Sequence, residues 1–359
     1  MSSEPFPDVG RAWTIGSWEA DEVTVAQVED ALLDLRRHEQ WAAVRTSVLT
    51  LVAVVDDKRS ADIALDVVHE LGARHPSRTI VLVLDDEDEG ASGRGNLDAA
   101  ATVHVLERNG TAVSFEEVIL RVRGKARHHL YSLIEPFTLP DLPVVVWLPS
   151  SLPSRGDPLL AAANRIVVDS RAVAESGGGG DPLGRISTLT RRLPVTDLSW
   201  TRLVAWRSLF AGLFEGGLNR PFLSGVREVV VAGNYGPRHL LGGWLLARLG
   251  LSPAIVHLES APHASIRLTA SAEGRMGRFV VERPSDERVI ESRIDIDGGP
   301  SLHQSLPLQR QWPAMSLARA LTDMGHDEQY QQALSGALLL RGPRTPRAPS
   351  STLAGATER

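Results

Sequence analysis

Runs of β-branched residues alternate with amphipathic helix patterns over the first half of the chain, and this alternation restricts the fold to the α/β class. Val44 to Val55 is such a run and predicts a strand. Ile63 to Leu71 carries apolar residues at helical spacing, and Thr79 to Leu84 is a second apolar run. Strand, helix and strand in this order predict a β-α-β unit with parallel strands and a right-handed crossover.

Further elements extend this pattern on both sides of the unit. Helices are expected over Val25 to Leu35 and Lys125 to Ile134. The additional predicted strands are Ala101 to Leu106, Glu117 to Val122, Leu142 to Pro149 and Arg165 to Asp169. The third of these is apolar throughout, which is typical of a strand buried on both faces. We therefore expect an N-terminal sheet flanked by helices.

The pattern changes after Ser176-Gly-Gly-Gly-Gly180, a segment typical of a flexible loop or linker. From Ser265 to Leu306 apolar and polar residues alternate, which predicts an antiparallel sheet covered on one face. The other elements expected here are helices after Asp181 and from Asp197 to Glu215, strands Val226 to Ala232 and Ala254 to Leu258, and helices Pro237 to Leu249, Trp312 to Met324 and Glu328 to Leu340.

A length of 359 residues favours two domains. We expect a flexible N-terminal segment over residues 1–22 and an N-terminal α/β domain over residues 23–175. A second α/β (α+β) domain with the antiparallel sheet is expected over residues 176–340. Residues 341–359 are rich in Pro, Ser, Thr and Arg, which predicts a disordered tail.

Charge and composition exclude several classes of function. A net charge of -6 gives no general attraction for nucleic acid or for an anionic membrane. The sequence shows neither a run of ~18 apolar residues nor a signal sequence, so we expect a cytoplasmic protein. The absence of cysteine excludes disulfides, thiolate metal sites and a cysteine nucleophile. No Gly-x-Ser-x-Gly, His-Glu-x-x-His or lysine-centred phosphate loop is present, which argues against an enzyme.

An aromatic helix is expected after Asp197, which is well placed as its N-cap. Leu203, Trp206, Phe210 and Leu213 recur at steps of three and four, so one face is apolar, and Arg202 lies off that stripe. Trp200 and Trp206 can be core residues, which is the commoner use of such side chains. Tryptophan beside arginine can also anchor another protein.

Two loops are candidate binding sites. Gly233-Asn-Tyr-Gly-Pro-Arg-His239 follows a strand and opens a helix, so Gly233, Gly236 and Arg238 could receive an anion. Its spacing matches neither a dinucleotide fingerprint nor a P-loop, and an ordinary turn explains it as well. In His75-Pro-Ser-Arg78, Pro76 stiffens the turn and leaves His75 and Arg78 to project at a sheet edge, as a connector or a binding loop.

His257, Glu259 and His263 contain metal-ligating groups, but no helix fixes their geometry. We therefore predict no metal site and no cofactor.

Four motifs in this order resemble the glucose-6-phosphate dehydrogenase assembly protein family, OpcA. They are the segments His75 to Val81, Leu139 to Pro149, Asp181 to Arg185 and Asp197 to Arg207. The resemblance implies a non-catalytic protein that binds glucose-6-phosphate dehydrogenase and favours its active oligomeric form. Thiol redox control, attributed to some members, is not carried over because this chain has no cysteine.

The motif positions that could bind the partner are His75, Ser77, Arg78, Trp147, Asp181, Arg185, Asp197, Trp200, Arg202, Trp206 and Arg207. The alternative function is a sugar-phosphate- or nucleotide-binding enzyme or sensor that uses the loop from Gly233 to His239. The sequence does not identify a small-molecule ligand.

Overall fold

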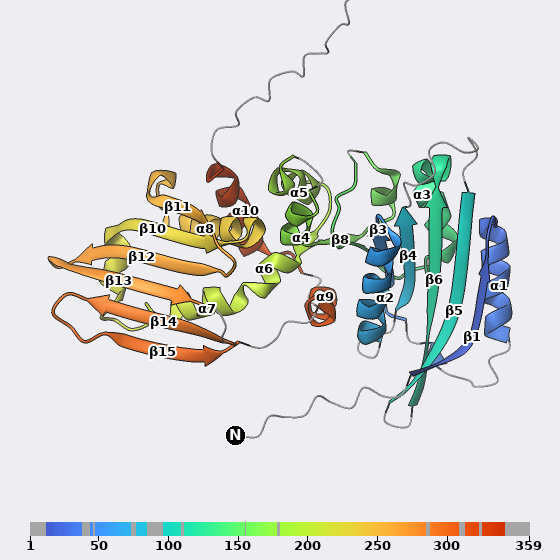
Figure 1. Ribbon diagram of the computed structural model, residues 1–359, viewed down its shortest axis with the longest axis horizontal. Helices are drawn as coiled ribbons and strands as arrows, with labels where there is room; N and C mark the ends of the chain where they lie inside the picture. The colour runs from blue at the N-terminus through green and yellow to red at the C-terminus, as the bar shows by residue number, and fades with distance from the viewer. Residues whose placement is uncertain are drawn as a thin grey trace, which may run out of the picture.

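The computed structural model describes residues 12–37, 44–45, 47–72, 77–84, 96–108, 111–154, 156–177, 180–284, 288–308, 313–322 and 325–341. These residues form two mixed sheets with helices packed against them, which confirms the α/β class. Figure 1 shows the two sheets at opposite ends of the molecule, with a group of helices that includes α4, α5 and α6 between them.

The first sheet has the strand order β1-β5-β6-β4-β3-β7-β8-β9, and β2 pairs with β6. The predicted β-α-β unit is present, because β3 and β4 pair in parallel and α2 (Lys58–Gly72) connects them. The strands are β1 (Ala12–Ala20), β2 (Val44–Arg45), β3 (Thr50–Val55), β4 (Arg78–Leu84), β5 (Asn96–Arg108), β6 (Thr111–Arg123), β7 (Val144–Leu148), β8 (Arg165–Val168) and β9 (Val195–Asp197).

Different helices cover the two faces of this sheet. On one face, Val52 and Val54 of β3 belong to the same apolar cluster as Val28 of α1 (Val25–Arg37). On the other face, Leu51 belongs to a cluster that includes Leu71 of α2 and residues of α9 (Pro313–Thr322). Side chains of a strand alternate between its two faces. Burial of both faces therefore explains why β7 is apolar at every position and β3 at every position except Thr50.

The second sheet has the order β11-β10-β12-β13-β14-β15. Strands β10 and β11 are parallel and the other pairs are antiparallel, which confirms the antiparallel sheet expected after Ser265. The strands are β10 (Val226–Gly233), β11 (Val256–Ser260), β12 (Ser265–Ala272), β13 (Arg275–Glu282), β14 (Val289–Ile296) and β15 (Leu302–Pro307).

The two sheets share one apolar core. A single cluster of buried side chains contains Val52 of the first sheet together with Val231 and Phe279 of the second. Helices between the sheets complete this cluster. The remaining helices are α3 (Leu130–Ile134), α4 (Ser170–Glu175), α5 (Pro182–Thr190), α6 (Leu198–Arg202), α7 (Val204–Gly212), α8 (Tyr235–Leu249) and α10 (Glu328–Leu339).

The structure corrects the expectation of a flexible segment over residues 1–22. Residues 12–20 form β1, which pairs antiparallel with β5, whereas residues 1–11 lie outside the described residues. Only Thr14 and Ile15 of this strand are β-branched, so its sequence lacks a strong strand pattern. Pairing with the long strand β5 and packing of Trp18 against the core hold it in place.

The first sheet also continues beyond the boundary expected after residue 175. Strand β9 is only three residues long and pairs in parallel with β8, so residues 195–197 belong to the first sheet. The division into two domains stays a prediction. The tail expected over residues 341–359 lies outside the described residues except for Arg341.

Two expected helices differ in detail. The segment from Asp197 to Glu215 forms two helices, because the N–H of Leu203 bonds the carbonyl of Trp200, only three residues earlier. This tight turn redirects the chain between α6 and α7. Residues Gly124–His129 form a 3-10 helix, and α3 begins only at Leu130. Among the described residues, no helix is both long enough and apolar enough to cross a membrane.

Candidate functional site

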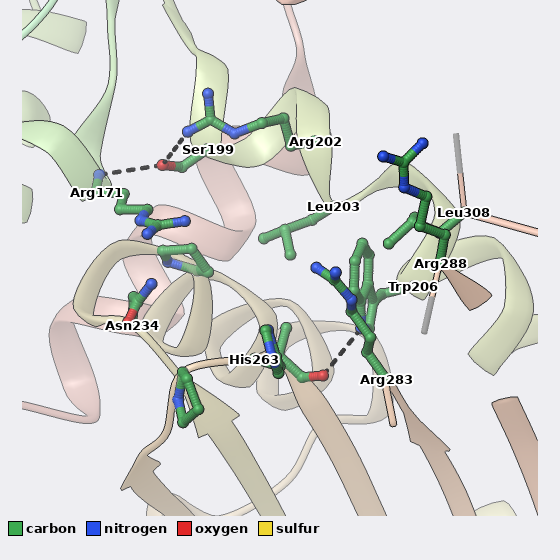
Figure 2. A pocket seen from close by; sticks show the side chains of 13 residues that line it. Arg171, Ser199, Arg202, Leu203, Trp206, Asn234, His263, Arg283, Arg288 and Leu308 are labelled. Atoms are coloured by element: carbon green, nitrogen blue, oxygen red, sulfur yellow. Dashed lines mark hydrogen bonds between the residues drawn. The ribbon is translucent and has the colours of Figure 1, made fainter. Parts of the chain in front are cut away.

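A cavity of about 500 Å³ lies where helices of the central group meet the second sheet. Arg171 of α4 and Arg202 of α6 line one side, and Arg283 and Arg288 line the opposite side (Figure 2). No aspartate or glutamate is among the described residues that line it. Within the described part of the chain, the lining therefore contains four arginine side chains and no carboxylate.

Carboxylates behind the cavity wall fix two of these arginines. Nη2 of Arg202 donates to both carboxylate oxygens of Asp169 at 2.7 Å. Nε of Arg171 donates to Glu175 at 2.8 Å. The hydroxyl of Ser199 accepts from the backbone N–H of Arg171 and donates to Asp169 at 2.7 Å. Asp169 is also the N-cap of α4. The carboxylate of Asp169 thus both caps α4 and orients Arg202.

The amino end of α8 forms another part of the wall. Asn234 is the N-cap residue, and its side chain makes no cap hydrogen bond. In the amide orientation that satisfies both of its polar atoms, its oxygen accepts from Arg171 Nε at 3.1 Å. Asn234, labelled in Figure 2, lines the cavity together with Pro237. The first turn of a helix favours anions, because its N–H groups and dipole are positive there.

The loop predicted to bind an anion therefore reaches the cavity, but through other residues than those expected. Gly233 has φ 144°, a conformation that favours glycine. A Cβ on Gly236 would lie 2.4 Å from Ser170 Oγ, so glycine allows α8 to approach α4. Arg238 donates to the carbonyl of Gly233 at 3.1 Å and does not line the cavity. Anion binding by Gly233, Gly236 and Arg238 stays a prediction.

An apolar wall completes the cavity. Trp206 and Leu203 line it, and the indole N–H of Trp206 donates to the carbonyl of Ala264 at 3.2 Å (Figure 2). Trp206 is 9% exposed. Leu308 contributes from the segment after β15. The lining therefore combines cationic side chains with aromatic and aliphatic ones.

The other aromatic motif residues belong to the core. Trp200 is 2% exposed, and its Nε1 donates to Asp327 at 2.7 Å. The guanidinium of Arg207 lies 3.5 Å above the Trp200 ring, and burial lowers the pKa of Arg207 to about 10. Asp197 is fully buried and accepts from the N–H groups of Ser170 and Ser199. Trp200 and Trp206 are thus both buried, as the core interpretation expects, and Asp197 is the predicted N-cap of α6.

Two family models match consecutive parts of the chain. The OpcA model described as the glucose-6-phosphate dehydrogenase subunit N-terminal domain matches residues 68–192. The model described as the C-terminal domain of the same subunit matches residues 193–334. The chain belongs to the OpcA family. This confirms the resemblance that the ordered motifs indicate, and α4, α6, α7 and α8, which line the cavity, lie within the matched residues.

Two relatives carry the name "putative OxPP cycle protein OpcA". The relative from Nostoc punctiforme is 26% identical over 209 residues, which are 56% of this chain and 44% of the relative. The relative from Synechocystis sp. is 26% identical over 189 residues, which are 51% of this chain and 39% of the relative. The matched part of this chain thus spans less than half the length of either OpcA relative.

A solved structure also shows a distant likeness. The WlbA dehydrogenase from Chromobacterium violaceum, in complex with NADH and UDP-GlcNAcA, is 11% identical with a TM-score of 0.33. The match covers 84% of this chain and 96% of that chain.

The OpcA motif around Arg78 lies in the interior of the first sheet. Ser77 and Arg78 are buried, and β4 lies between β3 and β6, so the expectation that Arg78 projects at a sheet edge is wrong. Arg78 pairs with Glu116 at 2.6 Å and donates to the carbonyl of Phe137 at 3.0 Å. The buried carboxylate is what draws Arg78 inward. His75 lies outside the described residues.

The remaining motif residues have structural contacts. Trp147 is buried in β7. Asp181 is the N-cap of α5 and forms an ion pair with Arg341. Arg185 donates to the carbonyls of Leu152 and Pro153 at 2.8 and 3.1 Å. The structure does not bring these three residues to the cavity. The contact of these three residues with a partner stays a prediction.

One group of potential metal ligands escaped the sequence analysis. The ligand atoms of His69, His104 and Glu117 lie within 4.8 Å of one another. They come from α2, β5 and β6, so no local spacing in the sequence links them. His69 Nε2 and Glu117 Oε2 are 2.8 Å apart, and this hydrogen bond raises the pKa of His69. The pair explains the position of both side chains without a metal.

The histidines and glutamate weighed as metal ligands from the sequence do not converge. Glu259 pairs with Arg267 at 2.8 Å, and His257 lies 3.9 Å from Glu228. His263 lines the arginine-rich cavity instead.

Proposed function

We propose that this chain is a non-catalytic cytoplasmic protein that binds glucose-6-phosphate dehydrogenase and favours its active oligomeric form. The observation that carries the proposal is the match of residues 68–334 to two consecutive models of a glucose-6-phosphate dehydrogenase subunit. The absence of the common catalytic motifs supports a role that does not involve chemistry of its own.

An effector of this kind acts through a difference in affinity. It shifts the dehydrogenase toward the active form only if it binds that form more tightly than the inactive one. Each tenfold shift in population requires about 1.4 kcal/mol of preference. Equal binding to both forms would leave the activity unchanged.

We place the contact with the dehydrogenase at the free edge of the second sheet. Strand β15 is the last strand of that sheet among the described residues, and all of its residues are exposed. An uncovered edge strand leaves backbone N–H and C=O groups unpaired, and such edges readily accept another strand. A partner strand on this edge would satisfy those groups.

Exposed apolar side chains at the same edge support this placement. Leu302 is 56% exposed and Leu306 is 40% exposed. Both line a groove of about 810 Å³ between α7 and strands β14 and β15. Leu209 of α7 and Leu213, which follows α7, line the same groove. Leu302 and Leu306 are four residues apart on one strand, so they share a face. Burying this apolar groove against a protein partner is more favourable than leaving it exposed to water, and the adjacent strand edge can pair with the same partner.

The test is activation of the dehydrogenase from the same organism by the purified chain. We expect no dehydrogenase activity from the chain alone and a higher activity of the enzyme when it is added. Leu302→Glu and Leu306→Glu should each raise the concentration of the chain needed for half-maximal activation at least tenfold, because each introduces a charge into an apolar contact. Ile63→Glu is the matched control, since Ile63 is 55% exposed on α2, on the first sheet.

Two outcomes contradict the proposal at different levels. If the parent chain neither binds nor activates the dehydrogenase at micromolar concentration, the assembly function is wrong. If the parent activates and both glutamate variants activate equally well, the function stands and the contact lies away from β15.

A further inference from the structure

We propose that the arginine-rich cavity between α4, α6 and α8 binds a phosphorylated sugar. This inference is independent of binding to the dehydrogenase, because the cavity and the β15 edge share none of the side chains on which the two arguments depend. It rests on three properties of the cavity, which are its charge, its helix terminus and its apolar wall.

The first property is the charge of the lining. Four arginine side chains, from α4, α6 and the connection between β13 and β14, line one cavity of about 500 Å³, and no described carboxylate lines it. Asp169 and Glu175 hold Arg202 and Arg171 from outside the lining. Like charges that share a cavity repel one another, so an anionic occupant is favoured. Phosphate oxygens match the planar fork of arginine and accept paired hydrogen bonds from it.

The second property is the amino end of α8. This helix of 15 residues begins after Asn234, whose side chain does not cap it. The side-chain oxygen of Asn234 instead accepts from Arg171, which links the helix terminus to the arginine side of the cavity. Helix dipole and guanidinium groups therefore act on the same space, and both favour an anion.

The third property distinguishes a phosphorylated sugar from a free phosphate ion. Trp206, Leu203 and Leu308 add apolar surface to the lining, and Trp206 and Leu308 lie beside Arg283 and Arg288 (Figure 2). The C–H face of a sugar ring packs well on an indole, whereas inorganic phosphate gains nothing from this wall. A volume of about 500 Å³ is within the range of small-molecule pockets, which is about 300–1,000 Å³. The occupant should therefore carry both a phosphate and a carbon skeleton.

Arg171 and Arg288 are suitable positions for the test because they line opposite sides of the cavity (Figure 2). Arg171 pairs with Glu175, which is itself 55% exposed, so removing Arg171 leaves no buried charge. Arg288 is exposed and has no ion pair within the part of the chain that the structure describes. Arg275 is the matched control, since it is exposed at the β12–β13 hairpin and does not line the cavity.

The experiment is titration calorimetry and thermal denaturation of the full chain with glucose 6-phosphate, glucose, inorganic phosphate, ribose 5-phosphate and AMP. We expect one site for a sugar phosphate and a higher melting temperature when it is saturated. Glucose should have no effect, and inorganic phosphate should bind at least tenfold more weakly. Arg171→Ala and Arg288→Ala should each weaken sugar-phosphate binding at least tenfold, and Arg275→Ala should not. Higher ionic strength should also weaken it.

Several results would overturn the proposal. Absence of binding by both sugar phosphates at millimolar concentration excludes the ligand class, and tighter binding of AMP than of either sugar phosphate assigns the cavity to nucleotides. Binding that Arg171→Ala and Arg288→Ala leave unchanged places the ligand elsewhere. If no phosphate compound binds and Arg288→Ala abolishes binding to the dehydrogenase, the cavity belongs to the protein interface. A variant that loses sugar-phosphate binding but still activates the dehydrogenase leaves the proposed function intact.

Discussion

At the scale of single residues, Asp197 shows how the junction between the sheets depends on one buried carboxyl. It accepts hydrogen bonds from Ser199 and Ser170 at 2.9 and 3.1 Å, and the Tyr330 hydroxyl lies 3.5 Å away. Burial, followed by the nearby charge of Asp169, raises the pKa of Asp197 from 3.8 to about 6. The same position therefore caps α6 and carries a charge that the interior disfavours.

The raised pKa predicts an unusual dependence of stability on pH. Between the unfolded pKa and about 6 the folded state binds more protons than the unfolded state, so the contribution of Asp197 to stability falls as pH rises through this window. Asp197→Asn keeps an acceptor oxygen for both N–H groups and removes the charge. Relative to the parent, we expect this variant to gain stability from pH 4 to pH 7, by on the order of 1–3 kcal/mol.

The measurement is urea denaturation of parent and variant at several pH values. Because other groups titrate in the same range, only the difference between the two proteins reports on Asp197. A difference that does not change between pH 4 and pH 7 would show that Asp197 titrates normally in the folded protein.

At the scale of elements, α8 and α10 lie unusually close together because each carries a glycine at the crossing. A Cβ on Gly243 would lie 2.1 Å from the carbonyl oxygen of Ala333 and 2.3 Å from the backbone N of Ala337. A Cβ on Gly336 would lie 2.4 Å from the carbonyl oxygen of Gly243. Backbone atoms of a helix cannot move aside as a flexible side chain can, so the crossing excludes any larger residue.

Gly243→Ala should therefore destabilise the protein by about 1–3 kcal/mol or more, the usual cost of overpacking a core. Gly212→Ala is the matched control, because Gly212 ends α7 and a Cβ there would meet nothing within 4 Å. Alanine in a compatible helical position is expected to stabilise by about 0.4–1 kcal/mol. Chemical denaturation measures the free energy of unfolding of each variant. A decrease for Gly243→Ala with an increase for Gly212→Ala would confirm the close helix crossing, and equal changes in the two variants would contradict it.

Sequence periodicity predicts the elements that bury a continuous face, and it fails where a partner far along the chain decides the structure. The strands β3, β4 and β7 are found because each is apolar at nearly every position. Strand β1 is missed because its stability comes from pairing with β5. Arg78 is misplaced because Glu116, which draws it into the interior, is 38 residues away.

The candidate site shows the same limit. Arg202, Trp206 and the loop at Gly233 to His239 are each recognisable from sequence, but their meeting at one cavity depends on the packing of α4, α6 and α8. Arg283 and Arg288 carry no local pattern. They lie at the ends of β13 and β14, and only the sheet brings them to the cavity.

At the scale of the whole molecule, the C-terminal helix α10 connects the two sheets. Asp327 is the N-cap of α10, where it accepts from the N–H of Tyr330 at 2.8 Å, and its other oxygen accepts from Trp200 of α6 at 2.7 Å. Tyr330 lies beside Trp200, with ring centroids 6.0 Å apart. Further along, α10 packs on α8, which covers strands β10 and β11. Contacts of one helix therefore extend from the end of the first sheet to the second.

This connection and the shared core predict that both sheets unfold in one cooperative transition. Asp327→Ala removes a helix cap, which costs about 0.5–2 kcal/mol, and leaves the buried N–H of Trp200 without its acceptor, which costs about 1–3 kcal/mol. We expect a lower melting temperature with a single transition retained, and a calorimetric enthalpy equal to the van't Hoff enthalpy in the parent. Asp327→Asn keeps one acceptor oxygen and replaces the other with an NH2 donor, so it can retain only one of the two hydrogen bonds and should lie between Asp327→Ala and the parent. Two separate transitions in the parent, with only one of them lowered by Asp327→Ala, would show instead that the sheets are independent domains and that α10 stabilises one of them alone.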